Sequence, residues 1–92
     1  MTYRIFETVA FRHDLARLDA FVRGRIEAKL RDSLYPRLRE EPHHGPNIRR
    51  LRDWTPATWR YRLGPWRLFY EIHEGERLVM MVALDHRREA YR

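Results

Sequence analysis

Arginine and aromatic residues alternate in the stretch TWRYRLGPWRLFYEI, residues 58–72, which is the first candidate for chemistry. Arg60, Arg62 and Arg67 stand there between tryptophan, tyrosine and phenylalanine side chains. Guanidinium is planar, permanently charged and able to bind a phosphate group through two hydrogen bonds. The stretch is therefore either a site for a phosphate-bearing ligand or a charged surface that only keeps the protein in solution.

A second chemical group lies at the chain end, in LDHRREAYR, residues 84–92. His86 can exchange a proton near neutral pH, Tyr91 can donate one, and Arg87 adds a cation. If this segment returns beside residues 58–72, cations and proton-transfer groups converge on one site. The alternative is a basic tail that follows the last strand.

The charge distribution favours a site for an anionic ligand. The 92 residues carry a net charge of +6, and 18 of the 19 basic residues are arginine. Residues 47–70 hold six arginines against Asp53 alone, a net of +5. This concentration is typical of proteins that bind nucleic acid or an acidic protein partner.

Composition also excludes several classes of site. Cysteine is absent, which removes disulfides, thiolate nucleophiles and thiolate metal sites. The five histidines show no metal-ligand spacing, and no glycine-rich phosphate loop is present, so we predict neither a metal nor a cofactor. No apolar run is long enough for a membrane span, and the first ten residues lack a secretory signal pattern, so we expect a cytoplasmic protein.

The elements that must position these residues follow from periodicity. Residues 3–8 alternate as a short strand, and the following leucine-rich stripe predicts helices near residues 10–17 and 20–35, the second capped by Asp19. Pro36 is expected to kink or end the helical run. Residues 40–47, with two prolines and a glycine, read as a loop.

Four further strands are predicted near residues 47–54, 58–64, 66–74 and 77–84. The order predicts a single α+β domain over residues 1–92, with a twisted antiparallel sheet and helices on one face. Side-chain alternation places Trp66, Leu68 and Tyr70 toward the helices. Arg60, Arg62 and Arg67 then share the open face.

These motifs resemble the RelE/ParE family of type II toxin-antitoxin toxins. The likeness rests on LYPRLREEPHHGPNIRRLRDWTPATWRYRLGPWRLFYEI, on LDHRREAYR and on the helical FRHDLARL, and it is closer to the RelE branch. The resemblance implies a RelE-like β-α-α-β-β-β(-β) fold. It also implies a ribosome-dependent endoribonuclease that cuts mRNA in the ribosomal A site, beside ribosomal RNA, and needs no metal. A cognate antitoxin would hold it inactive in a hetero-oligomer.

The resemblance also implies roles for individual residues. Arg67 matches the family's transition-state arginine, and Arg60 with Arg62 matches a basic pair that is lysine in well-studied RelE members. Arg87 matches an arginine after the last strand, and Tyr91 a tyrosine near the chain end. In this reaction an RNA 2′-hydroxyl attacks the adjacent phosphate and leaves a 2′,3′-cyclic phosphate. Because arginine stays protonated, we predict His86 as base or acid, with Tyr91 as its partner.

Two other functions are compatible with the same motifs. The ParE branch poisons DNA gyrase and needs no RNA-cleaving site, so the set of arginines with His86 and Tyr91 is the feature that favours the RelE reading. The third possibility is a non-catalytic member that only binds its antitoxin or RNA. Toxicity without RNA cleavage or gyrase inhibition would indicate that third class.

Overall fold

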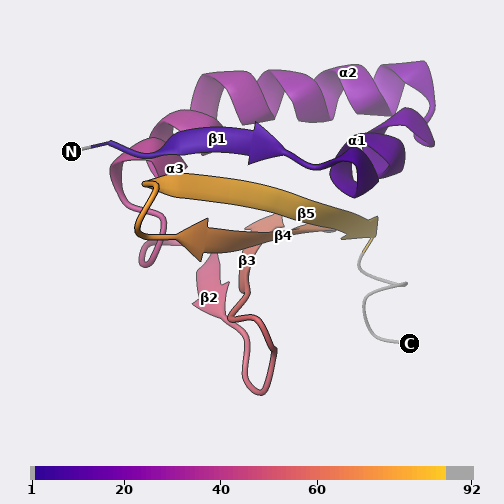
Figure 1. The fold of residues 1–92 in the computed structure, drawn as a ribbon. Helices are drawn as coiled ribbons and strands as arrows, with labels where there is room; N and C mark the ends of the chain where they lie inside the picture. Colours follow the sequence, from indigo (N-terminus) through magenta and orange to yellow (C-terminus); the bar gives the residue numbers. More distant parts are fainter. Residues whose placement is uncertain (1, 87–92) are drawn as a thin grey trace.

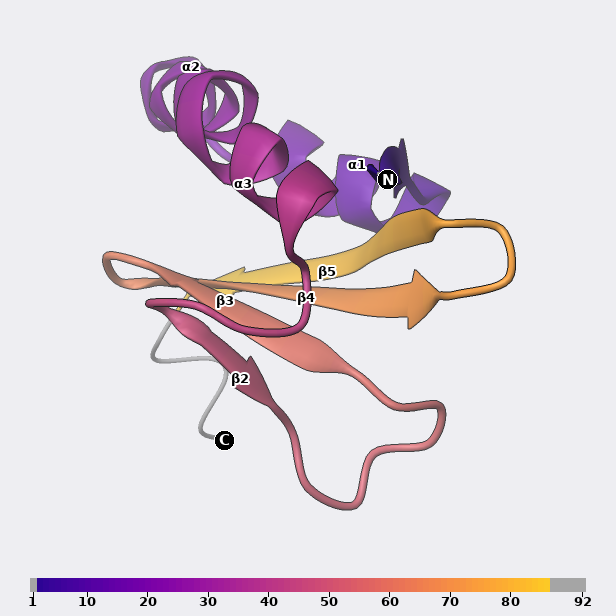
Figure 2. The same cartoon turned by 90° about the vertical axis from the view of Figure 1, so that its left-hand side faces the viewer.

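Five strands form one sheet in the order β1-β5-β4-β3-β2 in the computed structural model, which describes residues 2–86. The strands are β1 (Arg4–Glu7), β2 (Ile48–Arg50), β3 (Trp59–Leu63), β4 (Trp66–His73) and β5 (Leu78–His86). The helical elements are α1 (Val9–Ala16), α2 (Ala20–Lys29), a π-helical turn η1 (Leu30–Leu34) and α3 (Tyr35–Glu40). All helices lie on the same side of the sheet, as Figures 1 and 2 show from two directions. The predicted α+β class is confirmed.

The first two helices begin at side-chain caps. Thr8 accepts a hydrogen bond from the Phe11 backbone N–H at 3.1 Å, and Asp19 accepts one from the Val22 N–H at 3.0 Å. Each cap satisfies a backbone donor that the first turn of a helix leaves without a partner. The Asp19 cap was predicted from the sequence, and α2 begins at the residue after it.

The helical run continues past Pro36, where we had expected a kink or an end. The Tyr35 N–H bonds to the Leu30 carbonyl, so the chain widens into a π-turn just before the proline. Pro36 then occupies the first turn of α3, where a missing N–H costs no hydrogen bond. This arrangement lets the leucine stripe reach Leu38, which is fully buried.

The strands from β2 onward pair antiparallel, as predicted, whereas β1 pairs parallel to β5. A parallel pair needs a long crossover, and here the helices and the remaining strands supply it. The β3–β4 hairpin turns at Gly64, whose φ of 58° lies in the left-handed region that favours glycine. Leu63 and Trp66 close this two-residue turn.

Two strand boundaries differ from the sequence prediction. β2 ends at Arg50 rather than near residue 54, because the chain turns away at Asp53, whose φ is 60°. β5 continues through His86, which pairs with Trp66 of β4, so His86 belongs to the sheet and not to a tail. Residues 87–92 lie outside the described part of the chain.

The core lies between the helices and one face of the sheet. Leu68 and Tyr70 from β4 meet Val79, Met81 and Leu84 from β5, and each of the five is buried. Helical residues close the other side of this layer, namely Phe11, Leu15, Ile26, Leu30, Leu34 and Leu38. Truncating one such leucine to alanine costs about 2–5 kcal/mol, so this layer fixes the sheet on which the arginines stand.

Candidate phosphate-binding face

The face of the sheet away from the helices carries a hollow of about 660 Å³. It is lined by Arg49, Arg52, Arg60 and Arg67, together with Trp54, Phe69 and a short stretch of β5. Arg50 also borders it, but its guanidinium lies over the Trp59 ring, 5.4 Å from the ring centroid. Asp85 is the only acidic residue among the described residues of the lining. We call this hollow the arginine face, and its charge suits an anionic ligand.

Arg67 lies at the bottom of the arginine face and is only 4% exposed. Its Nη1 donates to the carbonyl oxygens of Gly64 and Trp66, at 3.2 Å each. Within residues 2–86, no carboxylate forms an ion pair with this guanidinium. A buried positive charge with only neutral acceptors is costly, and an anion entering the hollow would compensate it.

Arginines stand opposite one another across two strand pairs. Arg62 of β3 is in register with Arg67 of β4, and Arg49 of β2 is in register with Arg60 of β3. Like charges directly opposite in a sheet are destabilising, so their placement here works against stability. Such an arrangement is typical of a surface that binds an anionic ligand.

The predicted residues do not all converge. Arg60, Arg62 and Arg67 share the open face, as side-chain alternation predicted. Arg67 is nevertheless buried rather than exposed, because neighbouring strands and the β3–β4 turn surround it. Arg87 and Tyr91 lie outside the described residues, so their predicted convergence remains a prediction.

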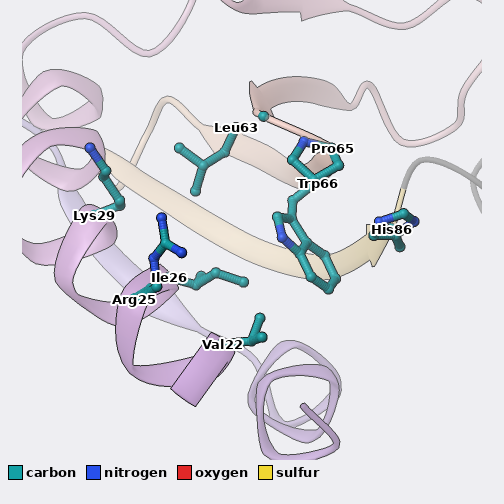
Figure 3. A pocket seen from close by; sticks show the side chains of 9 residues that line it. Val22, Arg25, Ile26, Lys29, Leu63, Pro65, Trp66 and His86 are labelled. Carbon is teal, nitrogen blue, oxygen red and sulfur yellow. The ribbon is translucent and has the colours of Figure 1, made fainter. Parts of the chain in front are cut away.

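His86 lies on the opposite face of the sheet from Arg67, which corrects the expected convergence. Its ring meets the Trp66 ring edge to face, with 5.0 Å between ring centroids. Both rings border a hollow of about 510 Å³ between α2 and the β3–β4 turn (Figure 3). The cause is alternation along β5, since Asp85 lines the arginine face and the next residue must point the other way.

Sequence reasoning missed part of the arginine face. Arg49 and Arg52 belong to it, and so do Trp54 and Asp85. The charge concentration over residues 47–70 was the available signal for the arginines. Trp54 had no such signal, because its position depends on how the β2–β3 loop folds.

A separate ionic cluster holds the loop after α3 against the β4–β5 turn. The His43 ring has Nδ1 at 3.0 Å from a Glu41 carboxylate oxygen and Nε2 at 2.5 Å from a Glu74 oxygen. Burial lowers the pKa of His43, but the hydrogen bonds that its ring donates to the Glu74 and Glu41 carboxylates outweigh this effect, so the pKa is raised. The Tyr3 hydroxyl donates to Glu74 at 2.6 Å and is the main cause of the lowered pKa of Glu74.

Neither a group of metal ligands nor a membrane-spanning helix occurs among the described residues. Among residues 2–86, histidines and carboxylates do not gather into a group of three able to hold a metal ion. The helices in this range are too short and too polar to cross a bilayer.

Comparison with solved structures finds the same fold in toxin-antitoxin complexes. A chain of the RelBE2 toxin-antitoxin complex from Mycobacterium tuberculosis matches with a TM-score of 0.73 and 25% identity, covering 95% of this chain and 100% of that one. The archaeal RelE-RelB complex from Pyrococcus horikoshii gives a TM-score of 0.69 at 21% identity, covering 95% and 97%. A free Escherichia coli RelE variant, with two arginines replaced by alanine, gives 0.69 at 19% identity, covering 99% and 90%.

Sequence comparison identifies the family. No curated protein matches the chain significantly. The family model described as the ParE toxin of the type II toxin-antitoxin system parDE matches residues 5–91, nearly the whole chain. The chain therefore belongs to the RelE/ParE family of toxins of type II toxin-antitoxin systems.

Proposed function

We propose that this toxin is an endoribonuclease that cuts mRNA, with the arginine face as its phosphate-binding site. The observation that carries the proposal is Arg67, a buried guanidinium that forms no ion pair with a carboxylate of the described residues. It stands between Arg62 of β3 and Asp85 of β5 in the sheet register. The likeness to RelE structures supports the same branch of the family. The resemblance of the sequence to that branch adds the ribosomal A site as the place of cleavage.

The arginine face suits the electrostatic part of RNA cleavage. Attack of the 2′-hydroxyl on the neighbouring phosphate gathers negative charge on the phosphorane oxygens. Arg67, fixed by Gly64 and Trp66, would stabilise this charge, with Arg60 and Arg62 beside it. A guanidinium held in place before the reaction needs no reorganisation when the charge develops.

Proton transfer needs groups other than these arginines, because a guanidinium does not deprotonate in proteins. The place of His86 behind the sheet removes it from the arginine face. We therefore assign the proton-accepting role to Asp85, which lines the hollow and stands opposite Arg67 in the register of β4 and β5. Tyr91, which we predicted as the partner of His86, is then assigned as the proton donor to the 5′-oxygen that leaves as the P–O bond breaks.

A cognate antitoxin is the partner that this function requires. Solved relatives are RelBE and RelE-RelB toxin-antitoxin complexes, which supports such a partner here. An acidic segment of the antitoxin would neutralise the arginines and exclude RNA from them. Binding of this kind weakens as salt concentration rises, because exposed charges are screened.

Mapping of mRNA 5′ ends after induction of the toxin without its antitoxin tests the proposal. We expect new 5′ ends within the reading frames of translated messages and none in matched messages that lack a start codon. An Asp85→Asn variant is expected to cut more slowly at the same positions. Intact messages in cells that stop growing would contradict the proposal.

Inhibition of DNA gyrase is the second candidate, because the matching family model is that of ParE toxins. The separation of His86 from the arginines also favours it, since a gyrase inhibitor needs no proton-transfer group. Supercoiling of relaxed plasmid by gyrase, measured with and without the purified toxin, distinguishes the two. Inhibited supercoiling together with intact messages would establish the gyrase reading.

A further inference from the structure

Trp54 is a large aromatic side chain left exposed beside the arginine face. It is 51% exposed, although it belongs to the lining of the same hollow as Arg60 and Arg67. The loop that carries it, between β2 and β3, lies at the end of the sheet farthest from the helices (Figures 1 and 2). An exposed tryptophan next to clustered arginines is a combination typical of single-stranded nucleic-acid binding.

The loop around Trp54 is held at its base. The Leu51 N–H donates to the Thr58 carbonyl at 2.9 Å, and the buried Thr58 hydroxyl donates to the Pro56 carbonyl at 2.9 Å. The positive φ of Asp53, at 60°, turns the chain just before the tryptophan. The indole is therefore presented by a defined backbone and not by an unconstrained strand end.

The indole packs one of its faces on Phe69. The two rings are nearly parallel, with an interplanar angle of 11° and 5.8 Å between their centroids. Phe69 is 9% exposed and lies next to Arg67 within the strand β4. Phe69 thus holds the Trp54 ring in place on one side. The rest of the half-exposed indole remains accessible to a ligand.

We propose that Trp54 is a stacking platform for a nucleobase of the bound RNA, beside the phosphate held at Arg67. The inference rests on the proposed function and names the residue that contacts a base within that site. Arginines that bind phosphate oxygens do not contact the bases, whereas an aromatic ring stacks on the face of a base. The hollow of about 660 Å³ has a volume within the range of small-ligand sites.

Binding of an uncleavable RNA tests the platform directly. The probe is a dye-labelled pentanucleotide with 2′-O-methyl riboses, compared with five versions in which one base at a time is removed. Fluorescence anisotropy gives the dissociation constants. For the wild-type protein, we expect removal of one particular base to weaken binding about 5- to 150-fold, the value of one base stacked on an aromatic ring.

Three variants identify the residue responsible. Trp54→Ala should weaken binding of the intact probe by the same factor and should no longer distinguish it from the probe lacking that base. Trp54→Phe should retain most of the distinction. Phe6→Ala is the matched control, because Phe6 is an aromatic residue of β1 that is also 51% exposed but lies outside the hollow. It should leave both dissociation constants unchanged.

Several results would overturn the stacking proposal. The first is that the wild-type protein binds the intact and the base-lacking probes with equal affinity. The second is that it does not bind the intact probe at millimolar concentration. The third is that Trp54→Ala still distinguishes the intact probe from the probe lacking one base. A Trp54→Ala variant that loses antitoxin affinity while keeping base discrimination would make the indole a protein contact. The 5′-end maps report separately on the proposed function, so cut messages with no effect of Trp54→Ala would remove this inference alone.

Discussion

The two faces of the sheet are built from the same strands but carry different chemistry. On the helix side, Trp66 and His86 border an apolar hollow against Val22 and Ile26 of α2 (Figure 3). On the other side, their sequence neighbours Arg67 and Asp85 line the arginine face. Because side chains alternate along a strand, neighbours in the sequence can belong to different sites.

The largest expected effect comes from Arg67. Arg67→Ala removes the buried guanidinium and should lower RNA cleavage about 10²- to 10³-fold, the usual effect of losing one group that stabilises transition-state charge. Growth arrest on induction and cleaved mRNA in a translation extract are the measurements. Arg67→Lys keeps the positive charge, but an ammonium group cannot bind a phosphate through two parallel hydrogen bonds as a guanidinium does. Its cleavage activity should therefore lie between those of the wild type and Arg67→Ala.

Arg31→Ala is the control for this substitution. Arg31 is an exposed arginine of η1 that pairs with Asp32 at 3.0 Å, on the helical side of the molecule. Its replacement should leave cleavage unchanged. A folded Arg67→Ala protein, checked by circular dichroism and thermal unfolding, that cuts mRNA as fast as Arg31→Ala would refute the role given to Arg67.

The sequence predicted the strand alternation and the α+β class, and hence the shared face of Arg60, Arg62 and Arg67. It could not predict that β5 continues through His86, because pairing with Trp66 of β4 extends that strand. It also could not show that Arg67 is buried, which depends on packing around the β3–β4 turn. Trp54 was missed because loop conformation, and not periodicity, places its ring on Phe69.

A smaller effect is expected where Arg49 stands opposite Arg60. Arg49→Thr removes a like-charge pair and should raise the free energy of unfolding by about 0.2–1 kcal/mol, measured by urea denaturation. It should also weaken RNA binding and reduce the salt dependence by about 0.7 in the slope of log K against log salt. If Arg49→Thr raised the free energy of unfolding without any loss of RNA affinity, RNA would not bind at the arginine face.

Arg4→Thr is the matched control for Arg49→Thr. Arg4 is also an exposed arginine on an edge strand, but it stands opposite Leu78 rather than another arginine. Replacement of Arg4 should change the salt dependence of RNA binding and the free energy of unfolding less than Arg49→Thr does. An equal effect of the two substitutions would mean that net charge alone, and not the arginine face, determines RNA binding.

The ionic cluster around His43 should affect stability through pH. The pKa of His43 is raised above its ordinary value of 6.5, so its contribution is present below that value and is lost as pH rises through the raised pKa. The pKa values of Glu41 and Glu74 are lowered from 4.5, so their contributions are lost only on acidification. The contributions of His43, Glu41 and Glu74 to stability are therefore all present at about pH 5.5.

His43→Gln tests this dependence. Urea unfolding of the wild-type protein should show a loss of stability between about pH 5.5 and 8.5 that is larger than in the variant. His43, Glu41 and Glu74 do not line the arginine face, so RNA affinity should be the same for both proteins. Identical pH profiles of stability would show that the cluster contributes nothing measurable.

The smallest effect on RNA cleavage is expected from a change of His86, which lies on the helix side of the sheet. His86→Phe keeps an aromatic ring against Trp66 and should change the rate of RNA cleavage by no more than about threefold, the range of ordinary surface substitutions. Cleavage rates of this variant and of Arg67→Ala should be measured side by side. A loss in His86→Phe as large as that in Arg67→Ala would move the reaction to the helix side.

The most direct test of the arginine face uses tryptophans as reporters of each side of the sheet. Trp54 borders the arginine face, whereas Trp66 borders the hollow behind it. The indole N–H signals in proton-nitrogen correlation spectra, assigned with single Trp→Phe variants, are followed during titration with the 2′-O-methyl RNA. The Trp54 signal is predicted to shift while that of Trp66 stays in place. A shift of the Trp66 signal with Trp54 unchanged would contradict the assignment of RNA binding to the arginine face.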